Sequence, residues 1–97
     1  MDTSKDRDDN PETSSLLTFP CVFPIKVMGR REDGFAQAVL EVVMRHAPDF
    51  HPATMEMRSS KNGRYLSFTV TINARSREQL DRLYSELSGH PMVIMVL

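Results

Sequence analysis

The segment HAPDFH holds three side chains of the kinds that bind metal ions, His46, Asp49 and His51. A catalytic zinc site usually needs three protein ligands in a defined geometry. Here we expect one histidine in the last turn of a helix, where a cation suits the helix dipole, and the other in a loop beside a proline. Both positions are commoner for structural histidines, so the sequence predicts no metal site and no cofactor.

Cys21 is the single cysteine of the chain, which excludes an internal disulfide and fits a reducing, cytoplasmic location. A nucleophilic cysteine needs an identifiable partner that lowers its pKa. Contact with His46 or His51 stays open, but a small half-buried thiol is the favoured interpretation. Paired carboxylates, a Ser/His/Asp arrangement and a glycine-rich phosphate loop are not found in the sequence. We therefore expect no catalytic residues and no enzymatic activity.

A group of basic residues is predicted at one end of a β-sheet, because the topology derived below brings residues 29–33, 60–64 and 88–91 together there. The free N–H groups at the start of a helix point to the same place. The candidate ligand-binding residues are Gly29, Arg30, Arg31, Lys61, Arg64 and His90. Such an arrangement suits a carboxylate or phosphate, so a sensor of a small anionic metabolite is one functional alternative. Glu32 and Asp33 neutralise part of the charge, which favours ordinary solvated loops.

The closing segment MVIMVL, residues 92–97, is apolar on both faces. We expect it to form an edge strand, and neither charge nor proline blunts that edge. The sequence does not decide which alternate residues face the helices. The predicted interaction surface consists of Met28, Thr69, Thr71, Met92, Ile94 and Val96. Its expected occupant is a protein partner or a second copy of the chain, and cover by the N-terminal tail or by residues 16–21 is the alternative.

Nucleic-acid binding is a further alternative and the least favoured one. An RNA-recognition module of this topology stacks bases on aromatic side chains of its two central strands. Here the outward faces of those strands offer hydroxyl groups, one lysine, and Tyr65 as a lone aromatic. The net charge is −3 over residues 1–15 and +2 over the remainder, and neither is the strongly basic footprint of a nucleic-acid-binding protein.

Alternation of apolar and polar residues indicates the strands that must position these groups. In RYLSFTVTIN, Leu66, Phe68, Val70 and Ile72 share one face, and mostly hydroxyl side chains take the other. Further strands are predicted at residues 22–29, 54–58 and 92–97.

Two helices are predicted between these strands, at residues 33–47 and 76–88, from apolar residues at helical spacing. Asp33 is the expected N-cap of the first helix. Ser76 and Gln79 form the expected capping box of the second helix.

Two glycines mark connections. The pair Asn62-Gly63 predicts a β-hairpin between the second and third strands. Gly89 is the expected residue directly after the second helix, and Pro91 blocks continuation of that helix.

The predicted order of elements is therefore β-α-β-β-α-β, the ferredoxin-like pattern of the α+β class. The right-handed crossover rule gives an antiparallel sheet of strand order 4-1-3-2, with both helices on one face of a two-layer sandwich. The Ser/Thr face of the third strand is then left uncovered.

Residues 1–15 contain five acidic residues and no apolar residue after Met1. Such a segment cannot bury enough surface to offset the entropy lost on ordering, so we expect a disordered acidic tail followed by one domain over residues 16–97. No stretch approaches the roughly 18 apolar residues of a membrane helix, and the acidic N-terminus is unlike a secretory signal.

Read together, FPIKVMG, VVMRHAPDF, SSKNGRYLSFTVTINA and MVIMVL resemble the YbeD-like family of small bacterial proteins over residues 16–97. The resemblance implies a ferredoxin-like αβ-plait similar to ACT regulatory domains, and it supplies no catalytic residues. Some members of that family are associated with lipoate metabolism, but its biochemical function is not established. Composition, topology and resemblance together predict a small cytoplasmic regulatory or adaptor domain that acts by binding.

Overall fold

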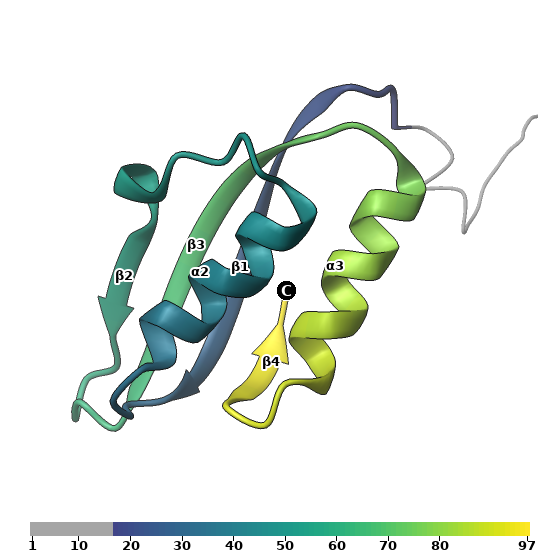
Figure 1. The fold of residues 1–97 in the computed structure, drawn as a ribbon. Helices are drawn as coiled ribbons and strands as arrows, with labels where there is room; N and C mark the ends of the chain where they lie inside the picture. Colours follow the sequence, from purple (N-terminus) through teal and green to yellow (C-terminus); the bar gives the residue numbers. More distant parts are fainter. Residues whose placement is uncertain (1–16) are drawn as a thin grey trace, which may run out of the picture.

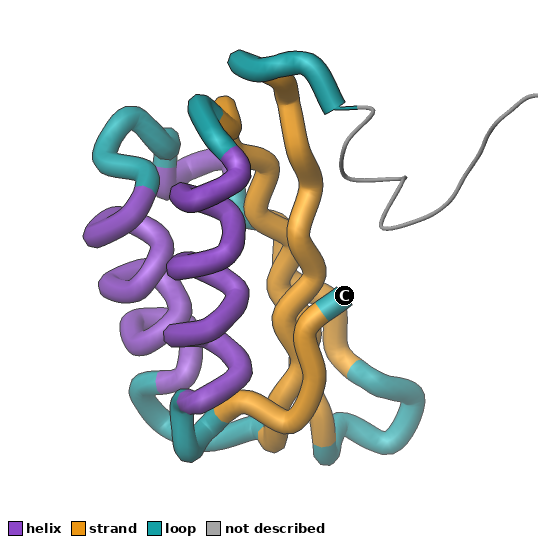
Figure 2. The backbone as a smooth tube through the Cα atoms, turned by 90° about the vertical axis from the view of Figure 1, so that its right-hand side faces the viewer, coloured by secondary structure: helices purple, strands orange, loops and turns teal. Residues whose placement is uncertain are grey.

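The computed structural model describes residues 17–97 and confirms the ferredoxin-like order of elements (Figure 1). The tail predicted at residues 1–15 lies outside the described residues. The elements are β1 (Cys21–Arg30), α2 (Phe35–His46), the 3₁₀ turn η1 (Pro52–Thr54), β2 (Glu56–Ser59), β3 (Tyr65–Ala74), α3 (Arg77–Gly89) and β4 (Val93–Val96). The antiparallel sheet has the order β2-β3-β1-β4, and both helices cover the same face of it (Figure 2).

The long strands β1 and β3 form the centre of the sheet. They pair along their whole length, from Cys21 opposite Ala74 to Arg30 opposite Tyr65. Their apolar residues point toward the helices, where Val27 is fully buried opposite a Phe68 that is 1% exposed. The polar residues of both strands point away from the helices, as the alternation of the sequence predicts.

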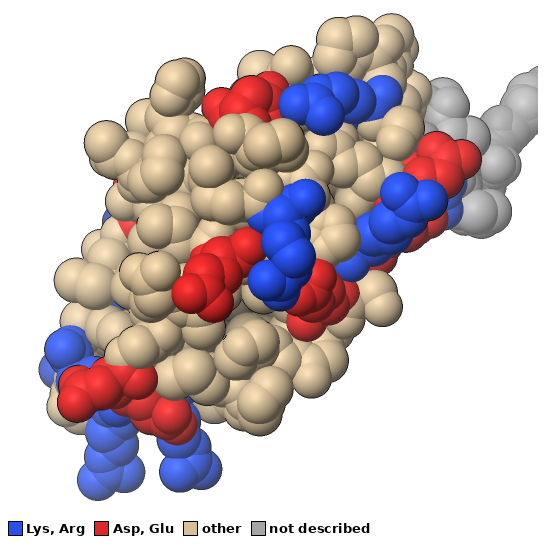
Figure 3. Space-filling view, viewed as in Figure 1, with Lys and Arg blue, Asp and Glu red and all other residues tan. Residues whose placement is uncertain are grey.

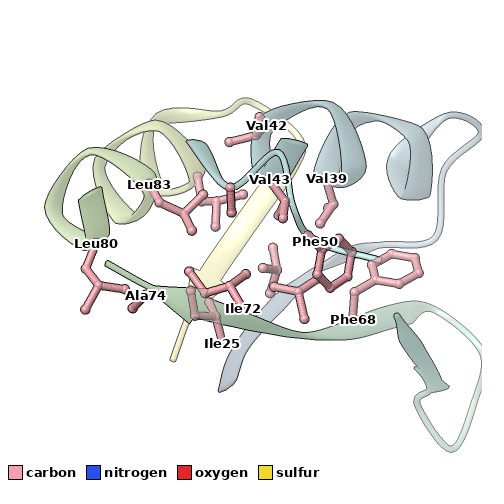
Figure 4. Close-up of a cluster of buried hydrophobic side chains, with 14 of the residues drawn as sticks. Ile25, Val39, Val42, Val43, Phe50, Phe68, Ile72, Ala74, Leu80 and Leu83 are labelled. Carbon is pink, nitrogen blue, oxygen red and sulfur yellow. The ribbon is translucent and has the colours of Figure 1, made fainter. Parts of the chain in front are cut away.

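The core fills the space between this sheet and the helix layer (Figure 4). Its helix residues are Phe35, Val39, Val42 and Val43 from α2 and Leu80, Leu83 and Leu87 from α3. The rings of Phe35 and Phe68 meet edge to face, with centroids 5.2 Å apart and an interplanar angle of 69°, which is a favoured aromatic geometry. Helix α2 is therefore anchored to β3 by its first residue.

The start of α2 differs from the prediction. The N-cap position is Gly34 rather than Asp33, with a left-handed φ of 85° and no side-chain hydrogen bond. The N–H of Phe35 donates to the carbonyl of Glu32 at 3.2 Å, so a tight turn precedes the helix. A left-handed residue at this position suits glycine, and the turn takes Asp33 out of the capping position.

The ends of α3 agree with the prediction only in part. Ser76 caps the helix by accepting the N–H of Gln79 at 3.1 Å. The Gln79 side chain accepts from the N–H of Arg75 at 2.6 Å rather than from Ser76 itself, and its amide group donates to the carbonyl of His46 at 2.8 Å. Gly89 is the last helical residue and the C-cap is His90, so the prediction that Gly89 directly follows the helix is wrong.

The hairpin predicted from Asn62-Gly63 is confirmed, with residues 60–64 connecting β2 to β3. The N–H of Ser60 donates to the carbonyl of Tyr65 at 2.9 Å and closes the connection. Gly63 is left-handed with a φ of 76°, and the side-chain oxygen of Asn62 accepts the N–H of Arg64 at 3.1 Å. Backbone freedom at one residue and a side-chain bond at its neighbour explain why this dipeptide turns the chain.

Candidate functional site

The face of the sheet opposite the helices is open (Figure 2). The strand register places the side chains of this face in rows that cross all four strands. The strand register defines one row as Arg58, Ser67, Met28 and Met95. The next row is Glu56, Thr69, Lys26 and Leu97, since Lys26 and Leu97 exchange backbone hydrogen bonds of 3.0 and 2.8 Å. The first row runs from a charged through a hydroxyl to two apolar side chains, and in the second row the cation Lys26 lies between Thr69 and Leu97.

Part of this open face is hollowed. A shallow depression of about 400 Å³ lies over the ends of β1, β2 and β3. Its lining includes Met28, Tyr65 and Leu97, together with the cations Lys26 and Arg58. Leu97 is 62% exposed and Tyr65 is 40% exposed, so an apolar surface meets solvent beside positive charge. Such a surface can bind a group that combines an apolar part with a negative one.

Strand β4 contributes to this face in an unexpected way because its register contains a bulge. Val96 pairs with Val27 and Met95 with Met28, but Val93 pairs with Gly29, which leaves Ile94 as the extra residue. Since Val27 points toward the helices, Val96 does so as well, and the bulge turns Val93 to the same side. Met95 therefore lies on the open face.

The bulge changes the composition of the predicted interaction surface. Met28 and Thr69 are half-buried on the open face, Thr71 is exposed there, and Ile94 is 57% exposed at the bulge. Met92 and Val96 instead pack against the core, so their expected position on the exposed surface is corrected. The exposed residues that the sequence interpretation missed are Met95 and Leu97.

One sequence signal, Gly29 within a strand, does point to the bulge. A glycine inside a strand often marks a bulge or a close approach of another backbone. A Cβ at this position would lie 2.3 Å from the carbonyl oxygen of Met92 and 2.5 Å from the Cζ of Phe35. Gly29 is thus required for packing at the start of β4, and it is buried rather than available to a ligand.

The basic residues predicted at one end of the sheet come together only in part. Arg30, Arg31 and Arg64 line an open depression of about 600 Å³ with Glu32 and Gly63. Basic side chains protrude from this end of the molecule beside acidic ones (Figure 3). Lys61 is exposed in the hairpin connection, but it does not line the depression.

The guanidinium group of Arg31 is already engaged. Its Nε donates to the carbonyl of Gly63 at 2.7 Å, and its Nη2 donates to the hydroxyl of Ser59 at 2.8 Å. Arg31 therefore holds the hairpin connection against the end of β1, and the cations that remain at the mouth of the depression are Arg30 and Arg64.

His90 belongs to a different connection, the turn from α3 to β4. Its Nδ1 accepts the backbone N–H of Met92 at 3.1 Å, a local contact that shapes the turn. His90 therefore shapes the turn that leads into β4. It does not line the basic depression.

The histidine and aspartate of the HAPDFH segment are separated by their contacts. The Nε2 of His46 lies 2.7 Å from a carboxylate oxygen of Glu86, which also pairs with Arg45, and Asp49 pairs with Arg75 at 3.1 Å. Burial, and then the nearby charges of Arg45 and Arg82, lower the pKa of His46. The lowered pKa of His46 favours the neutral imidazole, whose Nε2–H donates to the Glu86 carboxylate that links α2 to α3.

The described residues show no cluster of three or more His, Cys, Asp or Glu side chains able to hold a metal ion. Cys21, at the start of β1, is half-buried, and no hydrogen bond among residues 17–97 joins it to a histidine. Within the same residues, no helix has the length and apolar character needed to cross a membrane.

Comparison with known proteins identifies the family. The profile of a family described as "Protein of unknown function (DUF493)" matches residues 14–97. A UPF0250 protein of Nitrosomonas europaea is 58% identical over 83 residues, which cover 86% of this chain and 95% of that protein. A UPF0250 protein of Ralstonia nicotianae is 47% identical over 97 residues, the full length of both chains.

Solved structures at low identity share the fold. Protein HP0495 from H. pylori has a TM-score of 0.69 at 19% identity, covering 93% of this chain and 97% of that chain. The ACT domain from the GTP pyrophosphokinase of Chlorobium tepidum has a TM-score of 0.62 at 18% identity, covering 79% of this chain and 83% of that chain. The family resemblance noted in the sequence is thereby confirmed, and the chain belongs to the DUF493 family, with an ACT-like ferredoxin fold.

Proposed function

We propose that this chain is a non-enzymatic binding domain that docks a protein partner on the open face of its sheet. The observation that carries the proposal is the apolar surface that Tyr65, Met95 and Leu97 expose on that face beside the half-buried Met28. The helices bury the apolar residues of the opposite face, so this surface has no cover from the helix layer (Figure 2). Contiguous exposed apolar surface next to polar residues is characteristic of interaction sites.

The charges on the open face define the kind of partner. Arg58 lies opposite Ser67, Lys26 lies opposite Thr69 in the next row, and both cations line the depression. An apolar side chain seated against Met28 and Leu97 would bring flanking acidic residues to these cations. The partner is therefore a protein segment with an apolar anchor and acidic neighbours, for which electrostatic complementarity sets orientation and association rate.

The test uses a photo-crosslinking amino acid at two positions of the full chain, the half-buried Ser67 and the exposed Glu41. At Ser67, on the open face, we expect crosslinks to one distinct protein in the source bacterium. At Glu41, on the exposed side of α2, we expect none. Lys26→Glu together with Arg58→Glu should abolish the crosslink from Ser67. Equal crosslinking from both positions, or a crosslink indifferent to these charge reversals, would contradict the proposal.

Sensing of a small anion is a second candidate, favoured by Arg30 and Arg64 at the mouth of the basic depression. Inorganic phosphate, added while backbone amide NMR shifts are followed, should move the signals of residues 30–32 and 63–65. Arg30→Ala with Arg64→Ala should remove the response, while Arg31 is kept because it holds the hairpin connection. RNA binding has less support, because on the open face of the described strands the aromatic surface comes from Tyr65 alone.

A further inference from the structure

We propose that two copies of this chain pair through their β2 strands, antiparallel and about a twofold axis at Met57, so that the two sheets join into one. This inference does not rest on the docking proposal, and Arg58 is the residue that the docking depression and this edge share. β2 is an outer strand, all four of its residues are exposed, and Met57 is 63% exposed. In Figure 1, β2 lies to one side of both helices.

The hydrogen-bonding pattern between β2 and β3 shows which backbone N–H and C=O groups are free at the outer edge of β2. The N–H of Ser60 donates to the carbonyl of Tyr65 at 2.9 Å, so Ser60 turns its amide toward β3. Along an antiparallel strand, the N–H and C=O groups of successive residues point alternately to the two neighbouring strands. The backbone N–H and C=O groups of Glu56 and Arg58 therefore also point toward β3. Met57 and Ser59 direct their N–H and C=O groups outward, to the free edge. An antiparallel pair centred on Met57 lets the two copies exchange reciprocal hydrogen bonds between their Met57 residues.

The charges of β2 select this register. Glu56 and Arg58 flank Met57, and both lie on the open face because they pair with Thr69 and Ser67. Among the described residues, the ion pairs involve neither side chain. Centring on Met57 places Glu56 of each copy opposite Arg58 of the other, which gives two attractive cross-strand pairs. Centring on Glu56 or on Arg58 would place like charges directly opposite each other, which is destabilising.

The other face of the joined strands is apolar. Met57 is opposite Phe68 and therefore points to the helix side of the sheet, where the second copy's Met57 would meet it. A twofold axis makes the interface self-complementary, and the strand sequence Glu-Met-Arg satisfies this condition on both faces. Because so short a strand buries less than the roughly 800 Å² per partner of a standard interface, the dimer is expected to be weak and concentration-dependent.

The pairing is tested by charge reversal and mixing, with sedimentation of the full chain over a range of concentrations. The wild type should self-associate. Glu56→Arg alone and Arg58→Glu alone should each weaken self-association by at least about tenfold, because each opposes like charges. An equimolar mixture of these two variants should regain association, since every opposed pair is then attractive. The surface control Glu41→Arg on α2 should behave as the wild type.

Disulfide trapping tests the register independently. Residues in a hydrogen-bonded antiparallel pair have Cα atoms about 5.5 Å apart, within disulfide reach. In a Cys21→Ser background, Met57→Cys should crosslink two copies on mild oxidation and Ile94→Cys should not. A wild type that stays monomeric at every concentration, variants that fail to recover on mixing, or preferential crosslinking through Ile94→Cys would each overturn the proposal.

Discussion

The outer strands β2 and β4 are equally short, yet they differ in composition, cover and regularity. β4 is apolar, but α3 packs against it, Ile94 bulges out of its ladder, and the Tyr84 hydroxyl donates to the carbonyl of Leu97 at 3.4 Å. β2 carries charges, pairs regularly with β3 and is exposed throughout. The comparison teaches that the apolar outer strand is the one whose inner face a helix covers. The strand left exposed throughout is the one whose charges can select a partner.

The largest expected effect comes from placing the same charge on the inward face of each outer strand. Val96 packs against the core, so Val96→Asp should lower the free energy of unfolding by about 3 kcal/mol, the cost of an unpaired carboxylate in apolar surroundings. Met57→Asp should change it by no more than about 0.5 kcal/mol, because that side chain is 63% exposed. Urea unfolding at low protein concentration measures both, and equal losses would remove the distinction between the two edges.

The close approach at the start of β4 predicts the next effect. Gly29→Ala adds a methyl group 2.3 Å from the carbonyl oxygen of Met92, so β4 must shift, at a cost of about 2 kcal/mol. Gly89→Ala is the matched control, because nothing lies within 4 Å of the added group and the residue is helical. Its free energy of unfolding should stay level or rise by up to about 1 kcal/mol. A harmless Gly29→Ala would show that β4 is loosely held.

The cap of α3 provides a smaller perturbation of the helix that covers β4. Ser76→Ala removes the bond to the N–H of Gln79 and should cost about 1 kcal/mol, while Asp33→Ala, outside the capping position of α2, should cost a few tenths at most. The amides of β4 should lose protection from hydrogen exchange in Ser76→Ala and not in Asp33→Ala. The opposite ranking would mean that α2 is capped in solution by Asp33.

The smallest expected effect is a dependence of stability on pH through His46. Burial lowers its pKa in the folded chain, so below its ordinary value of 6.5 the unfolded chain binds a proton that the folded chain resists. Stability should fall as the pH drops from 7.5 through 6.5 and should level off below the lowered pKa. The urea midpoint at pH 7.5 and 5.5 measures this, and His46→Gln should reduce the difference. If the difference between the two urea midpoints were unchanged in His46→Gln, the pH dependence of stability would come from other titrating groups.

The sequence predicted most of the fold because period and turn chemistry agree over most of the chain. In β3, Leu66, Phe68, Val70 and Ile72 occupy one face only, so a single register buries them all. In β4 both faces are apolar, so the alternation of residues does not show which side chains point toward the helices. The bulge at Ile94 adds a shift of register that the apolar period does not encode, and Gly29 within β1 is the sequence signal that points to it.

The candidate site was predictable to the level of topology and no further. Strand order brings Arg30, Arg31 and Arg64 to one depression. Which guanidinium group is free depends on hydrogen bonds such as that from Arg31 to Gly63, and these follow from the conformation of the connection. The role of His90 is likewise set by a local bond to the N–H of Met92, which residue type and spacing do not encode.

Amide hydrogen exchange of the wild-type chain at low and high protein concentration compares the two edges most directly. The N–H of Met57 faces outward on β2, and that of Val96 faces outward on β4, because its neighbour Leu97 bonds to Lys26 of β1. If β2 is the edge that pairs, exchange at Met57 slows as the concentration rises, and exchange at Val96 stays the same. Slowing at Val96 with no change at Met57 would show that the apolar edge is the one that associates.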